Sequence, residues 1–261
     1  MPGPALVIPA WNEPETIGAV LDEVPPNTVG RVYVVVGDVA DPTADAARAA
    51  ALRRTGADVQ VLVPSRRGYG AACWTGAQAA LRDGAELVAF LDGDYSDPPA
   101  ELPRVLAPVL AGQADLVLGC RGPHAAGRPG SRWSPAARRS SAGSAGGSAL
   151  PLHARLGNAL VLGALRLLLG RAFADLPSFK AVRADALRRL DMHEMTYGWT
   201  VEMLVKAARA ELRISEVEVA YRRRLAGRSK VSGSWRGTLG AAWKLCTCAI
   251  GYATWSPVEA T

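Results

Sequence analysis

Two aspartates stand two residues apart directly after an apolar run, in the stretch FLDGDYSDPP at 90–99. In an extended chain, residues i and i+2 project to the same side. Asp92 and Asp94 can therefore converge on one point, while Gly93 lets the backbone bend between them. Carboxylate oxygens suit Mg²⁺ or Mn²⁺, ions that keep coordination positions open for substrate phosphates. The spacing favours a metal site.

Three other interpretations of these aspartates fit the sequence less well. A D-G turn usually joins two hairpin strands, whereas here a helix is expected to follow. A calcium EF-hand loop would need glycine and glutamate where Asp97 and Pro103 stand. Either aspartate could cap the next helix, although Ser96 and Asp97 are better placed for that. The sequence therefore favours metal binding by Asp92 and Asp94.

The composition is that of a globular protein. The chain has 261 residues, of which 49% are hydrophobic and 21% charged, enough for one large α/β domain. Four cysteines without C-x-x-C spacing favour a reduced, cytoplasmic setting, and no signal peptide is expected. The net charge of +6 suits an anionic partner, which could be a membrane surface, nucleic acid or a phosphorylated substrate. Charge alone does not choose among them.

Two apolar segments in the second half raise the question of a membrane. Residues 156–173 are interrupted by Arg166, and residues 239–255 by Lys244. Both are short or broken for a span of ~20 apolar residues. We expect core or amphipathic helices, with a peripheral contact on the inner face of the membrane left open.

Apolar runs and helical patterns alternate along the first 120 residues, which predicts an α/β fold: a mostly parallel sheet with helices on both faces. In such sheets, ligands lie beyond the carboxyl ends of the strands, where the two aspartates stand. The expected strands are 5–11, 31–37, 58–64, 86–92 and 114–120, and the expected helices are 14–24, 43–55, 70–84 and 99–112.

The amino-acid composition changes after Cys120. Residues 121–150 are rich in Gly, Ser, Ala and Arg, which predicts a flexible loop. Beyond it we expect helices at 153–170 and 198–210, strand-like segments at 175–183 and 212–224, and a basic turn at 225–233. The two halves, 1–120 and 151–261, are expected to belong to one domain.

Eight motifs then occur in order along nearly the whole chain: VIPAWNEPETI (7–17), DPT (41–43), RRGYGAACWTG (66–76), FLDGDYSDPPAEL (90–102), DLVLGCR (115–121), DLPSFKAVR (175–183), YGWTVEML (197–204) and RRRLAGRSKVSG (222–233). Together they resemble family 2 glycosyltransferases with the GT-A (Rossmann-like) fold. The branch that they resemble most is that of the dolichyl-phosphate and polyprenyl-phosphate mannosyltransferases. The resemblance implies a metal-dependent, inverting transfer from a GDP- or UDP-sugar to a polyprenyl phosphate, a small molecule or a polymer, and no nucleic-acid partner.

The resemblance assigns the first half to the nucleotide-sugar. Asp92 and Asp94 match the metal ligands of the family, with Gly93 between them. Gly68 and Ala72 match positions where the donor approaches a helix start, and a glycine turn at a helix N-terminus does suit phosphate oxygens. The other implied donor contacts are Pro9, Trp11, Glu13, and Asp38 or Asp41 in the nucleotide pocket, and Arg228, Ser229 and Lys230 over the diphosphate.

The loop and the second half are assigned to the acceptor. A hydroxyl acceptor would need a general base, for which Asp175 is the first candidate and Glu202 the second. A lipid phosphate is already anionic and needs none. The simpler alternatives are that Asp175 pairs with Arg183 and that Glu202 forms a surface pair with Lys206. The expected acceptor contacts are Arg121, Arg132, His153, Arg155 and Trp199, although tryptophan at such a position is more often core.

Departures from the family pattern leave the nucleotide and the acceptor open. VVVGDVADPT is one residue short and has Val36 or Gly37 in place of the first aspartate, and the 121–150 segment is long. A dinucleotide-dependent oxidoreductase is disfavoured, because the first strand-to-helix turn, PAWNEPE, contains no glycine. A basic RNA- or membrane-binding module without catalysis would explain the charge but not the paired aspartates.

Overall fold

The computed structural model describes residues 3–53, 57–121, 152–222, 224–225 and 235–257, with the backbone alone for 152–155 and 235–239. Seven strands form one sheet in the order β3-β2-β1-β4-β6-β5-β7. Strand β6 is antiparallel to both of its neighbours, and the other strands run parallel to one another. The strands are β1 (Ala5–Pro9), β2 (Arg31–Val35), β3 (Asp58–Leu62), β4 (Leu87–Phe90), β5 (Leu116–Arg121), β6 (Lys180–Arg183) and β7 (Ile214–Val219).

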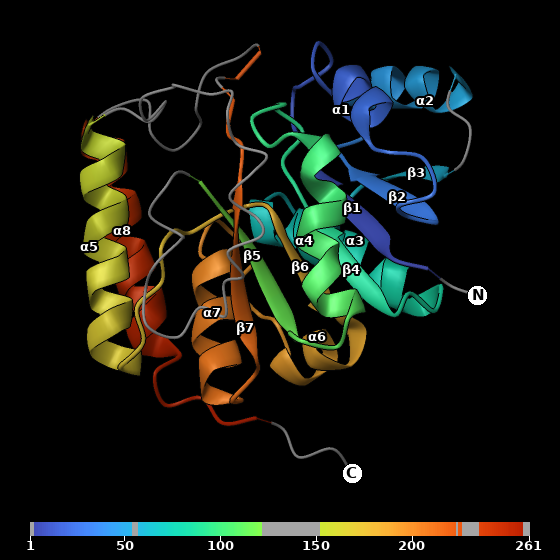
Figure 1. Ribbon diagram of the computed structural model, residues 1–261. Helices are drawn as coiled ribbons and strands as arrows, with labels where there is room; N and C mark the ends of the chain where they lie inside the picture. The colour runs from blue at the N-terminus through green and yellow to red at the C-terminus, as the bar shows by residue number, and fades with distance from the viewer. Residues whose placement is uncertain (1–2, 54–56, 122–151, 223, 226–234, 258–261) are drawn as a thin grey trace.

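Helices cover both faces of the sheet (Figure 1). One hydrophobic core joins the sheet to α1, α2 and α4, and the other joins it to α3 and the helices of the second half. The predicted mostly parallel α/β sheet is confirmed. The helices are α1 (Ile17–Glu23), α2 (Thr43–Arg53), α3 (Tyr69–Arg82), the 3₁₀ turn η1 (Pro99–Glu101), α4 (Leu102–Leu110), α5 (Leu152–Leu169), α6 (Ala184–Leu190), α7 (Trp199–Arg209) and α8 (Trp235–Gly251).

The second half departs from the prediction in two places. The strand expected over 175–183 is only β6, and it leads directly into α6, a helix that the sequence pattern did not predict. The strand expected over 212–224 ends at Val219, after which the Arg222 N–H donates to the Ser96 carbonyl. This hydrogen bond places the segment after β7 beside the turn that follows Asp94. In the described part of the chain, no helix is long and apolar enough to cross a membrane.

Close packing of α3 on the sheet depends on Gly76. A Cβ atom there would lie 2.4 Å from Val7 Cγ1 and 3.1 Å from Val35 Cγ2, on two buried β-branched residues. We expect Gly76→Ala to lower the free energy of unfolding by about 1–3 kcal/mol, since the strain of overpacking exceeds the gain in helix propensity. Gly163→Ala is the matched control, because a Cβ in that α5 position meets nothing within 4 Å. Urea denaturation of both variants measures the difference, and equal stability would contradict the packing argument.

Candidate active site

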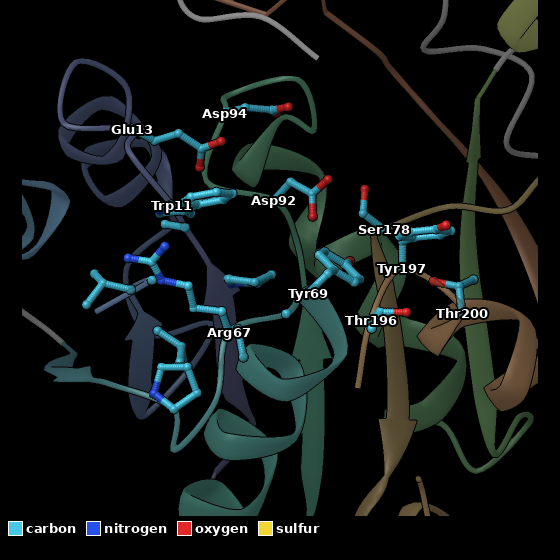
Figure 2. A pocket seen from close by; sticks show the side chains of 18 of the residues that line it. Trp11, Glu13, Arg67, Tyr69, Asp92, Asp94, Ser178, Thr196, Tyr197 and Thr200 are labelled. Atoms are coloured by element: carbon cyan, nitrogen blue, oxygen red, sulfur yellow. The ribbon is translucent and has the colours of Figure 1, made fainter. Parts of the chain in front are cut away.

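A cavity of about 570 Å³ opens beyond the carboxyl ends of β1, β2 and β4. Figure 2 shows Glu13, Asp92 and Asp94 on one side of it, beside Trp11, and Ser178, Tyr197 and Thr200 on the other. The polar and aromatic lining is supplied by Trp11, Glu13, Arg67, Tyr69, Asp92, Asp94, Arg121, Ser178, Thr196, Tyr197, Thr200 and Arg224.

One carboxylate oxygen of Asp92 has no hydrogen-bond partner among the described residues. This oxygen, Oδ1, is buried. Burial, together with the negative charges of Asp94, Asp97 and Glu13, raises the pKa of Asp92 to about 8, and Lys180 opposes the shift. A buried, unsatisfied carboxylate surrounded by like charge is an arrangement that a divalent cation would stabilise.

Gly93 packs closely against Ala10 and Glu13. A Cβ atom at this position would lie 2.7 Å from Ala10 Cβ and 2.8 Å from Glu13 Oε2, so a larger residue would displace Ala10 or the glutamate. The Thr16 hydroxyl donates to the Gly93 carbonyl at 2.7 Å, which fixes the bend. The close packing shows why a glycine stands at this bend, whereas the convergence of Asp92 and Asp94 on one ion stays a prediction.

Asp94 is buried and already paired. Arg224 Nε lies 2.8 Å from Asp94 Oδ2, and the Ser96 N–H donates to Asp94 Oδ1 at 2.9 Å. A metal ion would be held by Asp92 and Asp94, with its other ligands coming from water and substrate. In the described ranges, no group of three or more His, Cys, Asp or Glu side chains is placed to hold a metal.

Arg224 competes with a cation for Asp94 in this geometry. We expect Arg224→Gln to increase Mn²⁺ affinity, measured without nucleotide, by roughly tenfold, because a charge-assisted hydrogen bond of about 1.5 kcal/mol no longer opposes binding. Manganese binding followed by electron paramagnetic resonance measures the effect. Arg183→Gln is the control, since Arg183 pairs with Asp185 at the surface. An unchanged or weaker Mn²⁺ affinity of the Arg224 variant would rule out the competition.

Lys180 supplies the positive charge beneath the cavity. It is fully buried, and its Nζ donates to the Pro177 carbonyl at 2.9 Å, the Ser178 carbonyl at 3.0 Å and the Thr200 hydroxyl at 3.0 Å. Burial lowers the pKa of Lys180, while the negative charges nearby, Asp92 among them, oppose that shift. These bonds fix Ser178 and Thr200, which line the cavity.

Arg121 enters the cavity with a fixed orientation. Its Nε lies 2.6 Å from Asp175 Oδ2 and its Nη2 lies 2.9 Å from Asp175 Oδ1, a two-point ion pair. Asn158 Nδ2 and the Leu176 N–H also donate to Asp175 Oδ1. Burial raises the pKa of Asp175, but the Arg121 guanidinium, together with the Leu176 and Arg121 N–H groups, outweighs burial and holds that pKa below its usual range. Asp175 is therefore an ionised anchor for Arg121, and it does not line the cavity.

The other end of the cavity is closed by an indole and a guanidinium. Arg67 lies over the Trp11 ring, 5.7 Å from its centroid, and also pairs with Asp38. Asp41 is buried and accepts the N–H groups of Asn12 and Gly37 at 3.0–3.1 Å, which shapes the loop behind Trp11. Neither aspartate lines the cavity, although Pro9, Trp11 and Glu13 do.

The start of α3 forms part of the cavity wall. Gly68 and Ala72 line the cavity, but the Gly70 N–H donates to the Thr196 carbonyl and the Ala71 N–H to the Met195 carbonyl. These two N–H groups are therefore already paired within the protein, and the expected donor contacts of Gly68 and Ala72 stay a prediction. Gly68 has φ +151°, and a Cβ there would lie 2.2 Å from the Met195 carbonyl oxygen, so the glycine lets the two segments meet.

With this geometry in place, comparison with known proteins identifies the family. Residues 5–161 match the model of glycosyl transferase family 2. The chain belongs to this family. An uncharacterized glycosyltransferase of Mycobacterium tuberculosis is 35% identical over 90% of this chain and 92% of its own length. The undecaprenyl-phosphate mannosyltransferase of Micrococcus luteus is 33% identical, over 87% and 86%.

A solved structure supports the fold of this family 2 glycosyltransferase. Glucosyl-3-phosphoglycerate synthase from M. tuberculosis, crystallised with Mn²⁺, UDP-glucose and phosphoglyceric acid, has a TM-score of 0.65. It is 21% identical, and the match covers 98% of this chain and 81% of that one. The predicted family, the enzyme class and the GT-A fold are confirmed.

Two of the residues predicted for catalysis or acceptor binding lie inside the glycosyltransferase core. Glu202 is fully buried against Lys206, with Oε1 2.8 Å from Nζ, and it accepts the His193 and Glu194 N–H groups. The expected pair with Lys206 exists, but it is not on the surface. Trp199 is also fully buried, next to the rings of Trp74 and Phe90. Neither lines the cavity, so their positions support structural roles.

The remaining predicted contacts lie where the structure gives no side-chain geometry. Arg132, Arg228, Ser229 and Lys230 lie outside the described residues, and the side chains of His153 and Arg155 are likewise outside them. Asp175 pairs with Arg121, and Arg183 pairs instead with Asp185 and Asp115.

Sequence reasoning missed several site residues of this glycosyltransferase, namely Arg67, Tyr69, Ser178, Lys180, Thr200 and Arg224. A lysine within the apolar strand KAV was the one available signal, since a buried charge implies buried partners.

Proposed function

We propose that this protein transfers a sugar, with inversion, from a nucleotide-sugar to the phosphate of a polyprenyl phosphate, with Mg²⁺ or Mn²⁺ at Asp92 and Asp94. The observation that carries the proposal is the Arg121 guanidinium, held by Asp175 in the wall of the cavity that contains both aspartates. A planar, oriented guanidinium suits an oxyanion such as a phosphate. The nucleotide would lie toward Trp11 and Arg67, and the acceptor toward Arg121.

An anionic acceptor also explains why Asp175 is not arranged as a base. A general base works best with a pKa near the working pH, whereas Arg121 holds the pKa of Asp175 low. An acceptor phosphate needs no deprotonation, because its oxygen is already a nucleophile. That oxygen attacks the anomeric carbon, the bond from this carbon to the diphosphate oxygen breaks, and the nucleotide diphosphate leaves with the bonding electrons.

Different residues of the chain have different roles in this proposal. Asp92 and Asp94 would hold the cation, and a divalent ion bound there would supply Lewis-acid stabilisation of the negative charge on the diphosphate. Arg121 orients the acceptor, and Lys180 fixes Ser178 and Thr200 in the opposite wall. Pro9, Trp11, Glu13, Gly68 and Ala72 would contact the donor.

The relatives support this assignment by their names. One is an undecaprenyl-phosphate mannosyltransferase, and the solved neighbour holds Mn²⁺, UDP-glucose and the phosphorylated acid phosphoglyceric acid. Both named acceptors carry a phosphate group. A cytoplasmic location with peripheral contact to the inner face of the membrane follows from a lipid acceptor and is part of the proposal.

The test is a matrix of donors and acceptors. GDP-mannose, UDP-glucose and UDP-galactose are each incubated with Mn²⁺ or EDTA and with undecaprenyl phosphate, undecaprenol or 3-phosphoglycerate. We expect Mn²⁺-dependent transfer to undecaprenyl phosphate and none to the uncharged alcohol. Transfer to undecaprenol at a similar rate would require a base and would refute the proposal. Transfer to 3-phosphoglycerate alone would keep the anionic acceptor but refute the lipid.

Arg121→Lys tests the guanidinium itself. The lysine keeps a cation beside Asp175 but loses the two-point geometry, so we expect the KM for the acceptor to rise about 10- to 100-fold. The Kd for the donor nucleotide, measured by calorimetry, should stay the same. A change in nucleotide affinity without a change in acceptor KM would place Arg121 on the donor side instead.

A further inference from the structure

The outermost helices of the second half expose an unusual number of apolar side chains. Helices α5 and α8 pack against each other along their length and lie side by side at the edge of the molecule farthest from α2 (Figure 1). On α5, Leu160 is 57% exposed and Leu167 is 87% exposed, and on α8, Trp243 is 73% exposed and Ile250 is 61% exposed. A gathering of large apolar side chains on a surface usually marks an interaction site.

These side chains follow the helical repeat. On α5, Leu156, Leu160 and Leu167 are four and seven residues apart, while Val161 and Leu165 face the core. On α8, Trp243 and Ile250 are seven apart, and Ala242 and Ala249 are buried. Each helix therefore has an inward apolar stripe that packs and an outward apolar stripe that does not. We call the five exposed side chains Leu156, Leu160, Leu167, Trp243 and Ile250 the α5/α8 face.

The charge of the surrounding sequence identifies the partner's chemistry. Residues 121–174 contain eight arginines and no acidic residue, and residues 219–258 contain seven Lys or Arg and no acidic residue. These two stretches include α5 and α8. The rest of the chain holds the other 15 basic residues and all 24 acidic ones. The net charge of +6 is thus the sum of a strongly basic part and an acidic part.

We propose that the α5/α8 face docks on an anionic lipid bilayer, with its leucines and Trp243 in the interface. Apolar burial and attraction to anionic lipids act together in such binding, and tryptophan is favoured at the headgroup level. A second copy is disfavoured as the partner, because a two-fold contact would bring two acid-free, basic segments together. Nucleic acid would leave the leucines without a partner.

The inference rests on the proposed function in one respect: a lipid phosphate acceptor would explain why the enzyme binds a membrane surface. The test therefore omits acceptor, donor and metal. The full chain is sedimented with vesicles of phosphatidylcholine alone or of phosphatidylcholine with about one third phosphatidylglycerol, at low and high salt. We expect binding to the anionic vesicles, weakened by salt, and little binding to the neutral ones.

Variants locate the surface. Leu160→Gln and Leu167→Gln are each expected to weaken vesicle binding about tenfold, because each removes an apolar side chain from the interface. Leu52→Gln is the matched control, since Leu52 is 91% exposed but lies on α2. The melting temperature of all three should equal that of the wild type, because the side chains are already solvent-exposed.

Three results would overturn the inference. The first is no binding to anionic vesicles, and the second is binding that Leu160→Gln and Leu167→Gln leave unchanged. The third is a wild-type dimer in sedimentation equilibrium that these variants dissociate, which would make the face a contact between copies. Transfer to a water-soluble, short-chain lipid phosphate is assayed separately. If this transfer is absent while vesicle binding behaves as expected, the proposed function fails and the docking face stands.

Discussion

Asp92→Asn is expected to abolish metal-dependent nucleotide binding and, at the same time, to stabilise the metal-free protein. Without a cation, the Asp92 carboxylate meets Asp94, Asp97 and Glu13 with one oxygen buried and unsatisfied. Asparagine removes the charge and adds a donor. We expect turnover to fall by at least about 10³-fold, the scale on which removal of a charge-stabilising group acts. The free energy of unfolding should rise by about 1–3 kcal/mol at pH 8.

The pH dependence of this stabilisation has a definite sign. The folded protein holds the Asp92 proton up to about pH 8, against 3.8 for an unperturbed carboxyl, so it binds that proton more tightly than the unfolded chain. The contribution of Asp92 to wild-type stability therefore falls as pH rises from about 4 to about 8, whereas the asparagine variant lacks this contribution. The difference between the two should be near zero at pH 4 and largest at pH 8. Urea denaturation at several pH values, without metal, measures it.

Asp94→Asn is the matched comparison. Asp94 is buried but paired with Arg224 and with the Ser96 N–H, so its loss leaves Arg224 without its partner. We expect this variant to lose nucleotide binding as well, and to be less stable than the wild type. If both variants changed stability in the same direction, the contrast between an unsatisfied and a paired carboxylate would be wrong.

The part of the site that could be predicted from the sequence is local. Asp92, Gly93 and Asp94 follow one apolar strand, and the direction of a parallel sheet places them at its ligand-binding edge. Arg121 ends β5 at the same edge. Patterns that span a few residues and one strand direction are sufficient for such predictions, because the geometry follows from the pleat and the chain order.

The rest depends on contacts between residues far apart in the sequence. Asp175 meets Arg121 across 54 residues, so nothing near Asp175 shows that its carboxylate is already paired. Arg224 meets Asp94 only because the chain after β7 returns to the Ser96 carbonyl. Strand β6 has four residues and is antiparallel, too short for a periodic signal. Such long-range pairings determine which charged groups are available for chemistry, and no local pattern contains them.

Glu202 shows why a charged pair can mislead. Glutamate and lysine four residues apart on a helix usually indicate a solvent-facing side. Helix α7, however, is buried all round, with each residue from Trp199 to Lys206 packed inside, so the pair lies in the core. The two carboxylate oxygens of Glu202 accept hydrogen bonds from the His193 and Glu194 N–H groups. These bonds hold the segment that leads to Thr196 and Tyr197 in the cavity wall.

Lys206→Met should therefore be among the most destabilising single substitutions in the chain. It would leave the buried Glu202 carboxyl group without its partner, and it would remove the cation that lies 4.9 Å from the Tyr252 ring and 5.1 Å from the Trp255 ring. Breaking a buried pair from one side costs about 3–5 kcal/mol of unfolding free energy. The exposed pair of Arg48 and Asp45 is the control, since Arg48→Met should change stability by less than about 0.5 kcal/mol.

The double variant Glu202→Gln with Lys206→Met separates structure from catalysis. Removing both charges should recover much of the lost stability, because neither charge is then left unpaired in the core. If Glu202 only holds the 193–197 segment, the Glu202→Gln single variant, measured where it is fully folded, should keep its turnover to within about tenfold. A general base would show a loss of about 10²- to 10⁴-fold instead. Such a loss in a folded protein would return Glu202 to the catalytic site, against its burial beside Lys206.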